Sequence, residues 1–222
     1  MAAMPSTRSG WLAAKLPCSE AAMFNHRLSG FEQAVVTIHP GEYFVSSEDI
    51  IISTVLGSCV SVSLWDSRRR MGGINHFMLP GNPANEDTGQ AQSAKYGLFA
   101  MELLYNELLK RGAKKANLVA KVFGGGSVLQ LGPSNASRIP GSNVDFAFAY
   151  LEREKFAIVA SDTGGVLPRK VFFFAKTGRV LLKRLRGSQV AAVQREEADY
   201  LRSIRWTQAG TAIVFEPPSR QP

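Results

Sequence analysis

The chain of 222 residues contains two cysteines and three histidines, and this scarcity excludes two classes of protein. Two cysteines cannot form the disulfide framework of a small secreted domain. A structural zinc site usually needs four ligands close together, and so few cysteines and histidines leave little material for one. The sequence therefore predicts no metal ion and no other cofactor.

Long hydrophobic runs are also missing from the chain. No stretch reaches the roughly 18 apolar residues of a membrane-spanning helix. The first residues show neither the apolar core nor the small-residue cleavage site of a signal peptide. We expect a cytoplasmic protein in a reducing setting, without membrane insertion.

Acidic residues are fewer than basic ones, with 18 Asp and Glu against 26 Lys and Arg and a formal net charge of +8. A surface of this sign favours an acidic partner. No recognised nucleic-acid motif is present, so nucleic acid is not the expected partner. Hydrophobic residues make up 45% of the chain and charged residues 20%, which is typical of a globular protein.

The hydrophobic pattern mixes strands with helices and predicts the α+β class with an antiparallel-rich mixed sheet. Strands are expected at residues 34–38, 42–45, 50–56, 59–65, 72–79, 118–123, 157–160, 171–174 and 180–185, and helices at 93–111, 142–154 and 188–204. Ser142 and Asn143 are expected to cap the second helix. We predict a single domain over 31–187, an N-terminal arm over 1–30, and a C-terminal helix with a disordered tail over 188–222.

Cys59 and His76 are the pair of residues that suggests an active site. Cys59 opens an alternating run, a polar turn follows at residues 66–70, and His76 lies in the next apolar run. If the two runs form a hairpin, these side chains lie directly opposite each other, with Cβ atoms roughly 4.5–5.5 Å apart. An imidazole so placed can take the thiol proton and generate a nucleophilic thiolate.

Neighbouring residues could complete such a site. Cys59 follows Gly57 and Ser58 at a sharp break, where backbone N–H groups could hold a developing oxyanion. Ser53 and Thr54 offer hydroxyls that could orient the imidazole. The alternative is a buried structural cysteine and a core histidine, because a register shifted by one residue would put the two side chains on opposite faces.

Two glycine-containing stretches match known motifs only in part. Gly124 and Gly125 begin a run of three glycines after a strand, but the spacing and the lysine of a P-loop are missing. We interpret this run as a tight turn near a site. Asp162 and the following Thr-Gly match the aspartic-protease triplet, but that chemistry needs two carboxylates. We interpret Asp162 as a cap of the glycine bend that follows it.

Residues 53–62 and 73–80, which contain Cys59 and His76, closely resemble the CheD family of chemoreceptor glutamine deamidases. Further segments match this family in the same order, at residues 94–97, 121–126, 142–144 and 162–165. The resemblance runs from about residue 41 to residue 185 and leaves out both ends of the chain.

The resemblance implies a three-layer α/β sandwich and a Cys-His-Thr triad. Carried over to this sequence, Cys59 is the nucleophile and His76 is the base. The position of the family's threonine holds Ser53, which keeps the hydroxyl, and Thr54 follows directly. Either hydroxyl could orient His76.

The resemblance also implies a reaction and its partners. The thiolate attacks the side-chain carboxamide of a receptor glutamine, ammonia leaves, and the thioester is hydrolysed to glutamate. The implied partners are the cytoplasmic helices of methyl-accepting chemotaxis receptors and, in some bacteria, a CheC-type phosphatase. Two alternatives stay open: a methylesterase that acts on receptor glutamyl esters by the same route, and a non-catalytic regulator of a chemotaxis phosphatase.

Overall fold

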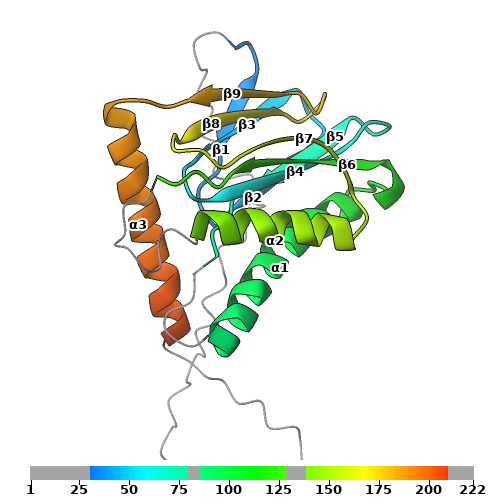
Figure 1. Cartoon of the computed structure of the whole chain (residues 1–222). Helices are drawn as coiled ribbons and strands as arrows, with labels where there is room; N and C mark the ends of the chain where they lie inside the picture. The colour runs from blue at the N-terminus through cyan, green and yellow to red at the C-terminus, as the bar shows by residue number, and fades with distance from the viewer. Residues whose placement is uncertain (1–30, 80–85, 129–138, 210–222) are drawn as a thin grey trace, which may run out of the picture.

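The computed structural model describes residues 31–79, 86–128 and 139–209, and within them two β-sheets and three α-helices (Figure 1). The first sheet has the strand order β1 (Ala34–Thr37), β3 (Ile50–Leu56), β8 (Arg169–Phe174), β9 (Val180–Arg184). The second has the order β2 (Tyr43–Ser46), β5 (Met71–Asn75), β4 (Val60–Asp66), β6 (Leu118–Gly124), β7 (Ala157–Thr163). The helices are α1 (Glu86–Lys110), α2 (Ile139–Arg153) and α3 (Ser188–Ala209), with a short 3-10 helix η2 (Lys115–Asn117) before β6.

The predicted α+β, three-layer architecture is confirmed, with the strands divided between two sheets. Each sheet has one parallel pair, β1 with β3 and β6 with β7, and its other pairs are antiparallel. The first sheet packs on one face of the second, and α1 and α2 cover the other face (Figure 1).

The alternation of side chains along β4 produces this layering. Val60, Val62 and Leu64 point into the core under α1 and α2. Cys59 contributes instead to the core between the two sheets, together with Ile74 of β5. Successive side chains of a strand point to opposite faces of the sheet. Since Val60 and Val62 face the helices, Cys59 faces the other sheet.

Strand β3 shows the same alternation in the first sheet. Ile50, Ile52 and Leu56 lie in the core between the sheets. Ile51 packs on the opposite face, in a separate cluster. Thr54 has the parity of the inner set and Ser53 that of Ile51, so these neighbours face different layers.

The structure corrects several element boundaries. Helix α1 begins at Glu86 and not at residue 93, and β7 continues to Thr163. Helix α2 begins at Ile139, three residues before the expected start, so Asn143 lies inside the helix and is not its cap. Strand β5 ends at Asn75, and beyond it only an isolated bridge between Val60 and Phe77 continues the pairing. The shorter strand leaves His76 in irregular backbone at the end of the hairpin.

Helix α3 confirms the helix expected at residues 188–204. The N-terminal arm at residues 1–30 and the end of the predicted tail lie outside the described residues, and the domain boundaries stay predictions. Of the helices that the structure describes, none combines the length and the apolar character needed to cross a membrane.

Candidate active site

The nucleophile candidate lies in the short connection between β3 and β4. Cys59 is fully buried, and its backbone carbonyl accepts a hydrogen bond from Gly125 N over 2.7 Å. Gly126 N donates over 2.6 Å to the carbonyl of Gly57 in the same connection. The glycine loop after β6 therefore lies beside the candidate nucleophile and holds its backbone, as expected for a turn near a site.

Gly124 and Gly125 are needed there for conformation and for space. Their φ angles are +111° and +65°, in the region that residues with a Cβ rarely adopt. A Cβ on Gly124 would lie 2.1 Å from the carbonyl oxygen of Cys59. A side chain at this position would therefore displace the backbone that carries the thiol.

Cys59 and His76 lie on the same face of the hairpin. They are not directly opposite each other, so that part of the prediction was wrong. Ser63 pairs with Ile74 and Val60 bridges to Phe77, so the same register would set Cys59 against Met78. The pairing is thus shifted by two residues, which keeps the face and makes Cys59 and His76 diagonal neighbours. The thiol sulfur and a ring nitrogen of His76 lie within 4.8 Å of each other.

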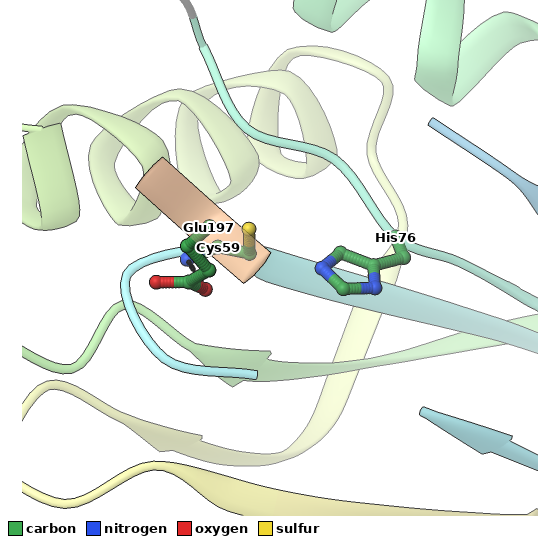
Figure 2. A group of neighbouring side chains, drawn as sticks. All are labelled: Cys59, His76 and Glu197. Carbon is green, nitrogen blue, oxygen red and sulfur yellow. Dashed lines mark hydrogen bonds between the residues drawn. The ribbon is translucent and has the colours of Figure 1, made fainter. Parts of the chain in front are cut away.

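Thr54 sets the orientation and the tautomer of His76. The Thr54 hydroxyl donates its proton to the carbonyl of Ile38 over 2.9 Å. Its oxygen, 2.8 Å from Nδ1 of His76, can then only accept, so the imidazole proton lies on Nδ1. Nε2 keeps a free lone pair, is buried and has no hydrogen-bond partner among the described residues. The ring points this nitrogen toward Cys59 (Figure 2).

Ser53 does not make this contact. Its hydroxyl is buried and has no hydrogen-bond partner within the described residues. Ser53 pairs with Thr37 of β1 and Phe172 of β8, on the other face of β3 from Thr54. Of the two hydroxyls left open by the sequence, the geometry favours Thr54 as the orienting residue.

A carboxylate from α3 is bound by the N–H and O–H donors of Gly57, Ser58 and Cys59, which we call the cradle. Oε1 of Glu197 accepts hydrogen bonds from Gly57 N at 2.9 Å and from Cys59 N at 3.0 Å. Oε2 accepts from the backbone N–H and the hydroxyl of Ser58, each at 2.8 Å. Gly57 and Ser58, predicted as oxyanion donors, thus converge with Cys59 on one carboxyl group. Figure 2 shows Cys59 between this carboxylate and His76.

Burial holds both reactive groups neutral in this arrangement. Burial lowers the pKa of His76 to about 3, and the neighbouring charge of His39 adds to the effect. Burial likewise raises the pKa of Cys59 well above its usual range, and the charge of Glu197 and its hydrogen bond with the thiol raise it further. The described site therefore contains a thiol and a neutral imidazole, not an ion pair.

Asn143 holds the backbone of the cradle through hydrogen bonds of its side chain. Its side-chain amide donates to the carbonyl of Ser58 over 2.8 Å, and its side-chain oxygen accepts from Leu79 N over 2.7 Å. The residue is fully buried. Helix α2 thereby links the Cys59 connection to the segment that follows His76.

Gly57 leaves the space that the carboxyl group uses. A Cβ at this position would lie 2.6 Å from Oε2 of Glu197 and 2.4 Å from a methyl carbon of Val128. Both distances are below ordinary van der Waals contact. The glycine therefore allows the Glu197 and Val128 side chains to approach the backbone closely.

Asp162 has a structural role, but this role differs from the predicted cap of the glycine bend. Its carboxylate pairs with Arg169 at 2.6 Å and with Arg184 at 2.8 Å. The Arg169 side chain is fully buried and also donates to the carbonyl of Gly164. The guanidinium, not the aspartate alone, holds the bend after β7. The bend in turn contacts the glycine loop beside Cys59, since Gly164 N donates to the Gly124 carbonyl over 2.9 Å.

Cys59, His76 and Glu197 each offer one atom that could bind a metal ion, all within 4.8 Å. The carboxylate oxygens, however, already accept four hydrogen bonds from N–H and O–H donors. Donors that converge in this way suit an anion or a carbonyl oxygen and repel a cation. The donor set fits acyl chemistry better than metal binding.

Glu197 and Asn143 are the site residues that sequence reasoning missed. The resemblance ended before residue 188, and Asn143 was expected at a helix end. One signal was available for Glu197: it stands in the apolar stripe of a predicted helix, between Val193 and Leu201. A charged residue at a core position of a helix needs a partner, and the sequence does not indicate which residues provide it.

Comparison with known proteins supports the resemblance. A family model described as CheD chemotactic sensory transduction matches residues 78–184. A "Probable chemoreceptor glutamine deamidase CheD" of Methylobacillus flagellatus is 44% identical over 187 residues, which cover 83% of this chain and 91% of the relative. A "Probable chemoreceptor glutamine deamidase CheD 1" of Albidiferax ferrireducens is 40% identical over 211 residues, 94% of this chain and 87% of the relative. One of Burkholderia thailandensis, named "CheD 2", is 47% identical over 171 residues, 77% of this chain and 86% of the relative.

Proposed function

Because the chain belongs to the CheD family, we propose that it is a cysteine-dependent amidohydrolase that converts glutamine side chains of chemoreceptors to glutamate. The observation that carries this proposal is the arrangement of two kinds of group around one thiol. Cys59 has an unprotonated ring nitrogen of His76 on one side and the convergent N–H groups of its own connection on the other. These are the groups that attack on a carboxamide requires.

The first half of the reaction forms a thioester. Nε2 of His76 takes the proton of the Cys59 thiol, and the thiolate attacks Cδ of the substrate glutamine. The carbonyl oxygen becomes an oxyanion, which the N–H groups of Gly57 and Cys59 are placed to stabilise. The C–N bond then breaks, and His76 returns its proton to the leaving nitrogen as ammonia departs.

The second half hydrolyses the thioester. Nε2 of His76 takes a proton from a water molecule, the resulting hydroxide attacks the acyl carbon, and the C–S bond breaks. The sulfur recovers a proton, and the product is a glutamate side chain. Thr54 keeps Nε2 of the neutral ring free to accept a proton at the start of each half, because the contact with the Thr54 oxygen holds the ring proton on Nδ1.

The implied substrate is the cytoplasmic helical region of a chemoreceptor, which would place the enzyme in the cytoplasm. The net charge of +8 suits an acidic partner of this kind. A CheC-type phosphatase as a second partner is also a prediction, since the described residues carry no feature specific to it.

The mass of a receptor fragment tests the proposal. A purified receptor cytoplasmic fragment is incubated with the wild-type protein and with Cys59→Ala, and its peptides are analysed by mass spectrometry. Deamidation replaces an amide NH₂ by OH and adds about one dalton per converted glutamine. Conversion by the wild type alone supports the proposal, and an unchanged fragment contradicts it. Loss of one methylene unit from a methylated fragment would identify the methylesterase alternative instead.

A further inference from the structure

Helix α3 carries one glutamate in the middle of its buried stripe. The buried residues on its described part are Val193, Glu197, Leu201 and Ile204. Glu197 is only 2% exposed, whereas the adjacent Glu196 is exposed. The helix stands at one end of the sandwich, as the orange helix of Figure 1, and crosses the connection that carries Cys59.

No cation neutralises this carboxylate within the part of the chain that the structure describes, where the Lys and Arg ion pairs involve other acidic residues. A buried charge without a partner would destabilise the fold. The four N–H and O–H donors of Gly57, Ser58 and Cys59 offset that cost. The carboxylate is thus held as a ligand of the cradle.

The ligand has the structure of the reaction's product. Deamidation of glutamine yields glutamate, so a glutamate whose Oε1 occupies the position of the oxyanion matches the product carboxylate. Ser58 strengthens this preference, because its N–H and hydroxyl both donate to Oε2. A glutamine would place an NH₂ group there, which cannot accept from the Ser58 N–H. The cradle therefore holds a carboxylate more tightly than a carboxamide.

We propose that α3 is an internal product mimic: Glu197 occupies the substrate site, and α3 must leave before a glutamine of another protein can react. The inference rests on the proposed function and adds two points to it. The enzyme is autoinhibited by its own helix, and its substrate is a glutamine presented on a helix that docks where α3 now lies.

Three lateral contacts define this docking site. The hydroxyls of Tyr200 and Tyr96 form a hydrogen bond between α3 and α1. Gln194 Nε2 donates to the carbonyl of Val128 over 2.6 Å. On the outer side, Glu196 lies 3.2 Å from Nδ1 of His39, where both groups are exposed and the pair stabilises little. Gln194 and Tyr200 lie three residues before and three residues after Glu197, on the helix face that contains the carboxylate, and Glu196 lies outside this face. A second helix with polar side chains at the same spacing can take the position of α3.

The electrostatics of the site agree with this arrangement. Glu197 contributes to the raised pKa of Cys59 through its charge and its hydrogen bond. When α3 leaves, that contribution disappears, and water and substrate reach the thiol. The departure of one side chain would thus both open the site and favour the thiolate.

The variant Glu197→Gln turns the mimic into a test substrate within the same chain. In the full-length protein, the Cys59 sulfur would bond to Cδ of the introduced glutamine, the C–N bond would break with loss of ammonia, and water would hydrolyse the thioester. Tandem mass spectrometry should find glutamate at position 197. Gln189 and Gln194 on the same helix are internal controls and should stay glutamine. In the double variant Cys59→Ala/Glu197→Gln, position 197 should stay glutamine as well.

The variant Glu197→Ala tests the inhibition itself. With a receptor cytoplasmic fragment as substrate, kcat/KM should rise by about tenfold or more, because the closed state loses the four hydrogen bonds of the carboxylate. Asp199→Ala removes an exposed carboxylate of the same helix, one that pairs with Arg202 and is not among the three docking contacts, and should leave kcat/KM within about twofold of the wild type.

The outcomes separate this inference from the proposed function. A wild-type protein that converts receptor glutamines, with no gain in Glu197→Ala and no conversion at position 197 of Glu197→Gln, overturns the inference and leaves the function standing. Lower kcat/KM in a folded Glu197→Ala also overturns it, since Glu197 would then assist catalysis. Conversion of the introduced glutamine without any activity on receptors supports the product mimic and contradicts the receptor as substrate.

Discussion

Thr54 Oγ1 lies 2.8 Å from Nδ1 of His76 and donates its only proton away from the ring, to the carbonyl of Ile38. This relationship makes a single hydroxyl responsible for the tautomer of His76, the proposed general base. It also connects β1, β3 and the end of the β4–β5 hairpin, so the base is positioned by three segments that are distant in sequence.

The first prediction follows from this contact. Thr54→Ala should lower kcat on a receptor fragment by about 10- to 100-fold with little change in KM, because the imidazole loses its orientation. Thr54→Ser keeps the hydroxyl and should recover most of the rate. Ser53→Ala, on the opposite face of β3, is the matched control and should retain wild-type turnover. A slow Ser53→Ala with a normal Thr54→Ala would contradict the assignment.

The second prediction concerns the nucleophile. Cys59→Ala should abolish deamidation, since no other group can form the thioester. Circular dichroism and thermal unfolding should show an intact fold, because a small residue replaces a small one. Cys18→Ala is the control: this cysteine lies outside the described residues and outside the stretch that resembles the family, and its loss should leave the rate unchanged. Residual turnover in Cys59→Ala would show that the site lies elsewhere.

The third prediction concerns Asn143. Asn143→Leu leaves the Ser58 carbonyl and the Leu79 N–H buried without their partner, at a cost of about 2 kcal/mol or more in the free energy of unfolding. Denaturant titration measures this loss. Asn106→Leu, an exposed asparagine on α1, should change stability by less than about 0.5 kcal/mol. Equal stability of the two variants would mean that the bridge does not hold the connection.

The fourth prediction concerns Gly57. Gly57→Ala should strongly reduce turnover, because the added Cβ enters the space next to the carboxyl-binding donors. Gly141→Ala is the matched control: a Cβ there meets nothing within 4 Å, and the position lies in α2, where alanine is the better helix former. The control should be as active as the wild type and at least as stable. Full activity in Gly57→Ala would show that substrate does not approach this backbone.

The fifth prediction concerns acid stability. The pKa of His76 is lowered to about 3 in the folded protein, so the unfolded chain binds more protons between that value and the ordinary pKa near 6.5. Stability is therefore present above about pH 6.5 and falls as the pH drops, by up to about 1.4 kcal/mol per pH unit from this group. Unfolding measured between about pH 6.5 and 5, where carboxylates contribute least, should show this slope.

Two variants assign the slope to its residue. His76→Gln should flatten it, because the buried titrating group is gone. His39→Gln removes an exposed histidine of the same region and should keep most of it. A slope that survives in His76→Gln and disappears in His39→Gln would reverse the assignment.

The local sequence determined much of this protein, because strand and helix periods can be read from neighbouring residues. The alternation in β4 placed Cys59 on the face opposite Val60 and Val62, and the polar turn after it predicted the hairpin with His76. The glycine run at 124–126 was expected beside a site and lies there. These features depend on residues a few positions apart, where spacing and geometry are tightly coupled.

The exact pairing was decided only by the tertiary structure. The hairpin register differs by two residues from the symmetric one, because the whole of β4 and β5 must also match β6 and β2. The choice between Ser53 and Thr54 depended on which face of β3 meets the second sheet. The sequence offered both hydroxyls, and only the stacking of the two sheets brought one of them to His76.

Glu197 shows where sequence reasoning ends. Its position in an apolar stripe could be read from the chain, but its partners are the N–H groups of residues 57–59, about 140 positions away. Backbone donors are present at every residue except proline and carry no sequence signal. Only the packing of α3 across the end of the sandwich shows that the carboxylate and the thiol share one site.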